Sequence, residues 1–193
     1  MKKNETEIFY PKNQTEWRNW LEENHLSKLN IWLVYYNKKS KIEAITWTEA
    51  VDVALCYGWI DSKRISIDTD TSHQFFSKRK PKSTWSKINK NKVEKLIEQG
   101  LMSEAGFKSI ETAKQNGSWT ILDEVEELIV PKDLEIEFAK KANSKEFFFN
   151  LSKSSKKIIL YWLVSAKTIE TRQRRIAEII ESAEQNLKPK HLR

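Results

Sequence analysis

The sequence predicts an α+β fold, in which a small antiparallel sheet is packed with helices and is followed by a C-terminal all-helical subdomain. The apolar run LNIWLVYY at residues 29–36 is rich in aromatic and β-branched residues, as in a strand covered on both faces. Residues 64–68 alternate between polar and apolar types, and residues 73–78 follow a turn as the partner strand. From residue 134 onward, apolar residues recur at helical spacing.

Four helices are predicted in the N-terminal part from the residues that begin them. Residues 13–16 and 46–49 have the Asn/Thr-x-x-Glu pattern of a capping box, in which two backbone N–H groups gain side-chain acceptors. Apolar residues follow each box at helical spacing, and Gly58 is placed to end the second helix. Ser86 and Ser103 are N-cap residues for two further helices.

The best candidate boundary is the acidic stretch around Pro131, because proline and a run of like charges are typical of a connection. Beyond it, helices are predicted over residues 134–142, 144–150, 155–167 and 168–186. We therefore divide the chain into an N-terminal α+β domain (1–120), an acidic linker (121–133) and a C-terminal helical subdomain (134–193).

The charges of the chain are unevenly spread around a formal net charge of +7. Residues 78–95 and 153–175 are strongly basic, each with a single acidic residue, whereas residues 123–137 are acidic with only Lys132 opposing. Such zoning indicates either polyanion binding or acidic and basic segments that pack on each other. A protein partner could bind through the acidic stretch 123–137 or through the basic helix 167–175.

Several classes of protein are not indicated. Cys56 is the single cysteine, so an internal disulfide is excluded, and the widely separated histidines have no metal-ligand spacing. The four glycines form no nucleotide-binding motif, so no cofactor is expected. The N-terminus has no secretory signal and no apolar run is long enough to span a membrane. We expect a cytoplasmic protein.

The segment at residues 78–89 is the main candidate for a binding site. It lies between a predicted strand and a helix start, where backbone N–H groups favour anions. Lysines can neutralise phosphates and a tryptophan can stack on a base, so a phosphorylated or nucleic-acid ligand is predicted. The alternative is a solvated loop whose Trp85 belongs to the core. The predicted ligand-binding residues are Arg79, Lys80, Lys82, Ser83, Trp85 and Lys87, with Asp61, Lys63 and Tyr57 near the preceding helix end.

A second hypothesis is a small-molecule enzyme that uses Cys56 as the nucleophile with Asp61 and a histidine. Against it, a free cysteine on a short apolar helix is more often a small buried hydrophobe, and nothing local would lower its pKa. Asp61 can equally be a turn residue that bonds its own backbone. We therefore predict a binding protein, with no catalytic residues assigned.

Several blocks of sequence together resemble the YdeI/OmpD-associated family, also described as bacteriocin-protection proteins. These blocks are ITWTEAV (45–51), ALCYGWIDS (54–62), KPKSTWSKIN (80–89), SAK (165–167) and TRQRRI (171–176). The resemblance implies a bacterial protein with a role in protection against bacteriocins or antimicrobial peptides, or in stress response. It implies no catalytic residues that can be placed on this chain.

Overall fold

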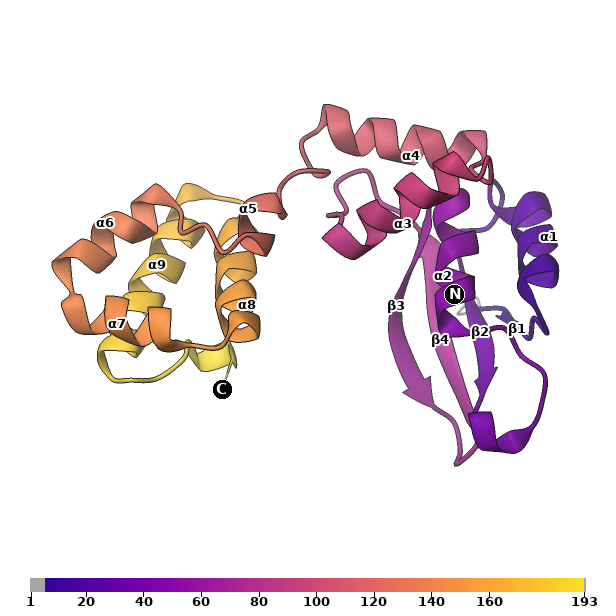
Figure 1. Cartoon of the computed structure of the whole chain (residues 1–193), viewed down its shortest axis with the longest axis horizontal. Helices are drawn as coiled ribbons and strands as arrows, with labels where there is room; N and C mark the ends of the chain where they lie inside the picture. The colour runs from indigo at the N-terminus through magenta and orange to yellow at the C-terminus, as the bar shows by residue number, and fades with distance from the viewer. Residues whose placement is uncertain (1–5, 193) are drawn as a thin grey trace, which may run out of the picture. The chain divides into compact units, whose positions relative to one another are not determined.

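The computed structural model describes residues 6–192 and confirms the α+β class. The chain forms two compact units, Met1–Trp119 and Thr120–Arg193 (Figure 1). The strands belong to the first unit, and the second is built from helices, as the hydrophobic periodicity predicts. In the part of the chain described, no helix has both the length and the apolar character needed to cross a membrane.

The sheet has the order β1-β2-β4-β3. Its strands are β1 (Ile8–Phe9), β2 (Asn30–Tyr36), β3 (Trp59–Ser66) and β4 (Thr71–Lys78). The three long strands pair antiparallel, and the short β1 adds to β2 in parallel, so the sheet is mixed. The β3–β4 hairpin turns at Asp68, whose side chain accepts hydrogen bonds from the backbone N–H groups of Asp70 (2.8 Å) and Thr71 (2.7 Å).

The helices of the first unit begin at the predicted N-caps, because each cap side chain accepts a backbone N–H three residues on. They are α1 (Gln14–Asn24), α2 (Trp47–Cys56), α3 (Lys87–Glu98) and α4 (Glu104–Gln115), with the 3-10 helix η1 (Lys38–Ser40) before α2. Thr46 and Glu49 form the complete capping box of α2. Gly58, at a φ of +69°, ends that helix and leads directly into β3.

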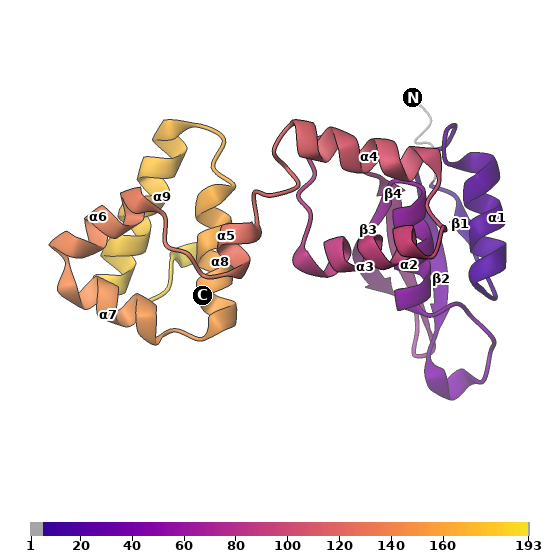
Figure 2. The same cartoon turned by 45° about the horizontal axis from the view of Figure 1, so that its top comes forward.

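The core of the first unit lies between α2 and one face of the sheet. Helix α2 contacts α1, α3, α4 and β3, and Figure 2 shows it in front of the strands. Trp17, Trp59 and Phe76 are fully buried in this core. Trp32 and Phe75, on the alternate sheet face, are only partly buried. The helical side of the sheet thus carries most of the apolar burial.

The second unit contains the helices α5 (Asp123–Glu126), α6 (Lys132–Lys140), α7 (Ala142–Asn150), α8 (Lys153–Val164) and α9 (Ile169–Glu184), and the 3-10 helix η2 (Lys190–Leu192). Its core includes Phe138, Phe148 and Leu163. The acidic stretch contributes α5 to this unit, with Val125 buried in the same core.

Candidate functional site

Two of the predicted ligand-binding residues form the internal packing of the loop between β4 and α3. The Arg79 guanidinium lies over the Trp85 ring, with its carbon 3.6 Å from the ring centroid, and Nη1 donates to the Thr84 carbonyl at 3.1 Å. Arg79 is 9% and Trp85 1% exposed. Burial lowers the pKa of Arg79 to about 10, although the nearby Asp61 carboxylate favours the charged form. Stacking of a ligand on Trp85 would require this pair to open.

The exposed lysines of this region are Lys80 and Lys82, between Arg79 and Trp85 in the loop, and Lys87, the first residue of α3. Ser83 of the loop is half-buried. The turn is held from within by the Ser83 N–H, which donates to the Lys80 carbonyl at 2.9 Å. It is also held by Asn116, the residue that follows α4, whose side chain donates to the Pro81 carbonyl at 2.7 Å. The lysines therefore project from a braced loop.

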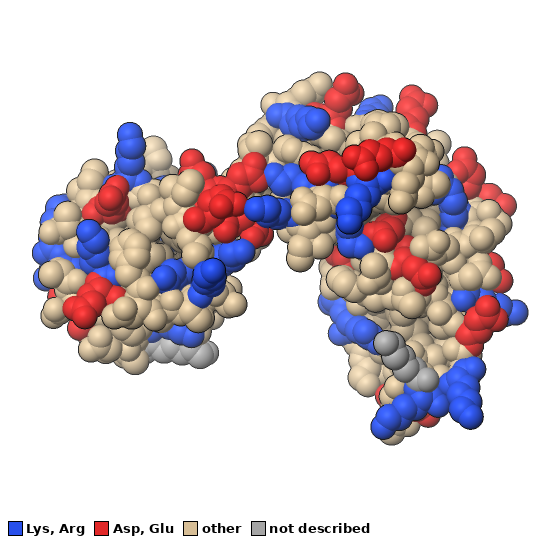
Figure 3. Space-filling model, in the orientation of Figure 1, with Lys and Arg blue, Asp and Glu red and all other residues tan. Residues whose placement is uncertain are grey.

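Helices α3 and α4 bring further cations to this loop around a second tryptophan. The Trp119 ring packs against Trp85 with centroids 5.0 Å apart. The Nζ atoms of Lys90 and Lys114 lie 5.5 Å and 5.4 Å from the Trp119 centroid. We call Lys80, Lys82, Lys87, Lys90 and Lys114 the basic surface. Acidic and basic side chains lie side by side over α3 and α4 on the face shown in Figure 3.

The remaining predicted site residues make their contacts elsewhere. The Tyr57 hydroxyl donates to the Glu22 carboxylate, and burial together with this bond raises the pKa of Tyr57 to about 12. The Lys63 ammonium lies over the Trp32 ring, 5.2 Å from its centroid. Asp61 accepts a hydrogen bond from the Trp47 indole at 2.9 Å. Asp61 is linked to the loop through the effect of its charge on Arg79.

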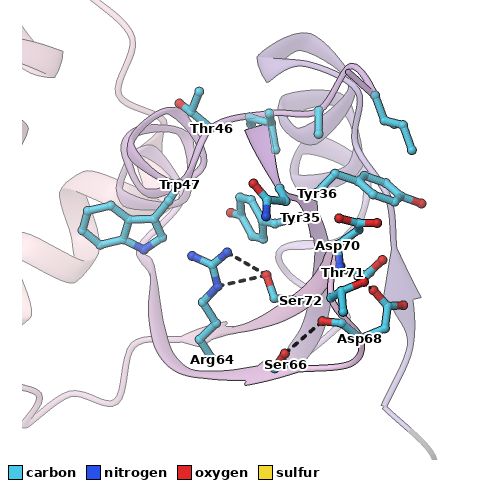
Figure 4. Close-up of a pocket in the computed structure, with 15 residues that line it drawn as sticks. Tyr35, Tyr36, Thr46, Trp47, Arg64, Ser66, Asp68, Asp70, Thr71 and Ser72 are labelled. Carbon is cyan, nitrogen blue, oxygen red and sulfur yellow. Dashed lines mark hydrogen bonds between the residues drawn. The ribbon is translucent and has the colours of Figure 1, made fainter. Parts of the chain in front are cut away.

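A cleft of about 770 Å³ opens between the start of α2 and the turn end of the sheet (Figure 4). Arg64 on β3 crosses its floor and donates to the Ser72 hydroxyl of β4 through Nε (3.0 Å) and Nη2 (2.7 Å). Tyr35 of β2 is the register partner of Ser72, and the buried Tyr35 hydroxyl has no hydrogen-bond partner among the described residues. This site was not predictable from the sequence, because strand alternation does not reveal which residues pair across three strands.

The basic helix of the second unit makes its contacts within that unit. Arg172 is paired with Asp133 at the start of α6, with Nη2 donating to Oδ1 at 2.8 Å. This ion pair holds the pKa of Asp133 below its usual range. Arg175 lies over the Trp162 ring at 5.0 Å and donates to Ser165 at 2.9 Å. Acidic and basic segments therefore pack on each other here, which is one of the two explanations of the charge zoning.

We expect Cys56 to react slowly with iodoacetamide near neutral pH, and more slowly than in the urea-unfolded chain. The residue is 1% exposed, and burial raises the pKa of the thiol even though Arg18 opposes that shift. The thiolate therefore forms at higher pH in the folded protein than in the unfolded chain. The labelling rate of the folded protein should accordingly begin to rise at a higher pH than that of the unfolded chain. Timed mass spectrometry measures both rates. Fast labelling of the folded protein would favour the enzyme hypothesis.

Two family models match this chain, one within each of the two compact units. Residues 9–109 match the model of a domain of unknown function, DUF8412, and this match spans more than half of the chain. The chain belongs to the DUF8412 family. In this DUF8412 protein, residues 127–186 also match the OmdA model, described as bacteriocin-protection, YdeI or OmpD-associated. The resemblance to that family is thereby confirmed for the C-terminal helices. No curated protein and no solved structure matches the chain significantly.

Proposed function

We propose that this DUF8412 protein is a non-enzymatic binding protein whose basic surface binds a polyanionic ligand such as a nucleic acid. The observation that carries the proposal is that Lys90 and Lys114 lie over the Trp119 ring, which packs against Trp85 in the loop that carries the exposed Lys80 and Lys82. Lysines on a braced loop lose little backbone freedom when phosphates bind, and each contact releases counterions. The OmdA description adds protection against bacteriocins as the proposed biological setting.

The loop has buried residues that hold its conformation and exposed residues that are available to a ligand, and this arrangement also supports the proposal. Arg79 and Trp85 brace the loop from inside, and Lys80 and Lys82 lie exposed on either side of Pro81. Removal of Arg79 would therefore disturb the fold and the proposed site together. Removal of the two lysines changes charge and leaves the buried pair in place, so it is the sharper test.

The double substitution Lys80→Ala and Lys82→Ala is expected to weaken binding of a single-stranded oligonucleotide by roughly tenfold at low salt. If each lysine neutralises one phosphate, the slope of log affinity against log salt should fall in magnitude by about 1.4. Fluorescence anisotropy titrations over a series of salt concentrations measure both quantities. Circular dichroism should show an unchanged fold, because both side chains are exposed.

The matched control is Lys12→Ala with Lys39→Ala, which removes the same charge from other exposed positions of the first unit. It should change the affinity by less than about twofold, since distant exposed charges are screened by salt. If both double variants lost the same affinity, the loss would be explained by net charge alone and not by the position of the lysines. An unchanged affinity in the loop variant would exclude the basic surface as the binding site.

A further inference from the structure

The Tyr35 hydroxyl is buried beside the cleft of Figure 4. Tyr35 is 4% exposed, and its hydroxyl oxygen has no hydrogen bond to the described residues. In Figure 4 this oxygen points into the space between Arg64 and Trp47. Burying a hydroxyl without a hydrogen bond is unfavourable, and proteins satisfy nearly all such groups. A group from outside the chain that enters the cleft would supply the missing partner.

The polar groups around this hydroxyl are arranged as donors. The Ser72 hydroxyl oxygen accepts two N–H groups from Arg64, so its own proton is directed away from that side chain. The Arg64 guanidinium carbon lies 5.6 Å from the Tyr35 ring centroid and brings a positive charge. Burial and the nearby Asp61 carboxylate raise the pKa of Tyr35, which keeps its proton available for donation. The three side chains therefore suit an anionic acceptor.

The other residues that line the cleft restrict the chemistry of a ligand that carries this anionic group. Ile42, Ile45 and Trp47 line its wall, and Trp47 is 45% exposed. Asp68 and Asp70 line the end formed by the β3–β4 turn. These carboxylates disfavour a ligand with several negative charges, and the apolar wall favours an aliphatic or aromatic body.

We propose that this cleft is a binding site for a small organic acid with one carboxylate and an apolar body. The carboxylate accepts hydrogen bonds from Arg64, Ser72 and the Tyr35 hydroxyl, and the body packs against the exposed side chains of Ile42 and Trp47. Arginine suits this role because its planar guanidinium matches the geometry of a carboxylate. The site is separate from the basic surface and makes no use of the loop at residues 78–89.

The test is titration of the full chain with benzoate and indole-3-acetate, and with the neutral benzamide and indole-3-acetamide. The Trp47 indole N–H donates to Asp61 beside the cleft, so its nuclear magnetic resonance signal reports binding; Trp47→Phe assigns it. We expect a saturable shift of this signal with at least one of the acids and a much weaker effect with its amide. Tyr35→Phe and Arg64→Gln should each weaken acid binding by roughly tenfold or more, as loss of a hydrogen bond to a charged group does.

Two controls keep the outcome decisive. Lys95→Gln removes one charge from an exposed position of α3 and should leave acid binding unchanged. Without acid, Tyr35→Phe should unfold at the same temperature as the parent chain or higher, because the hydroxyl that it removes has no partner in the part of the chain that the structure describes. Absence of a saturable shift, equal binding of acid and amide, or a lower unfolding temperature for Tyr35→Phe would each overturn the proposal. Oligonucleotide binding should be unaffected by Tyr35→Phe, so the two proposed sites can fail separately.

Discussion

Replacing Trp85 by alanine should lower the free energy of unfolding by about 3–5 kcal/mol, the usual range for removal of a large buried aromatic side chain. Trp85 is 1% exposed, its face is covered by the Arg79 guanidinium, and its ring packs against Trp119. The substitution leaves a cavity and exposes the guanidinium that was stacked on the ring. Urea denaturation followed by circular dichroism measures the change in unfolding free energy.

The same substitution separates the two interpretations of Trp85 that the sequence left open. Trp47→Ala is the matched control, because it removes the same side chain from a position that is 45% exposed, and it should cost less than half as much. If Trp85→Ala instead retained parental stability and lost oligonucleotide binding, Trp85 would be a stacking platform for the ligand. We expect Trp85→Ala to lower the free energy of unfolding, as removal of a core residue does.

Gly106→Ala should destabilise the first unit by about 2 kcal/mol or more, although alanine is the better helix former by up to about 1 kcal/mol. A Cβ added at Gly106 would lie 2.2 Å from the Cys56 carbonyl oxygen. This backbone group cannot rotate away as a side chain could. It also accepts the hydrogen bonds of the Ser103 N–H (3.0 Å) and hydroxyl (2.7 Å) at the start of α4. The α2–α4 contact would therefore have to open, which chemical denaturation detects.

Gly100→Ala is the matched glycine control for this prediction. Apart from its two chain neighbours, no described residue has an atom within 4 Å of a Cβ built at Gly100, so the cost there comes from its φ of +68° alone. We expect a loss of about 1 kcal/mol for that backbone strain. A Gly106→Ala variant as stable as the parent would show that α4 can move away from α2 without loss of packing.

The helix starts and ends of the first unit were predictable because their signals are local. Asn13, Thr46, Ser86 and Ser103 each cap a helix through a hydrogen bond to a backbone N–H three positions away. The start of β3 was harder to predict from the sequence. The alternating pattern places the strand at residue 64, whereas β3 begins at Trp59, where the first residues are more buried and a pairing irregularity follows Asp61.

The candidate loop shows where such local signals end. Its composition indicates anion binding, but a run of residues does not reveal which cations face solvent. The burial of Arg79 depends on Trp85 and on the Thr84 carbonyl, and the position of Trp85 depends on Trp119 from beyond α4. The sequence could not show that Lys114 and Trp119 lie near the loop, because no periodicity relates them to residues 80–87.

The sequence by itself determined the α+β class, the order of the long helices and strands along the chain, the N-caps of the first unit and the charge zones, since each depends on residues within a few positions of one another. Tertiary structure alone decided which lysines form the basic surface and that Tyr35, Arg64 and Ser72 line one cleft. Those three residues meet through the pairing of β2 with β4 and of β3 with β4. Strand register is set by burial across the whole sheet, so no segment specifies it alone.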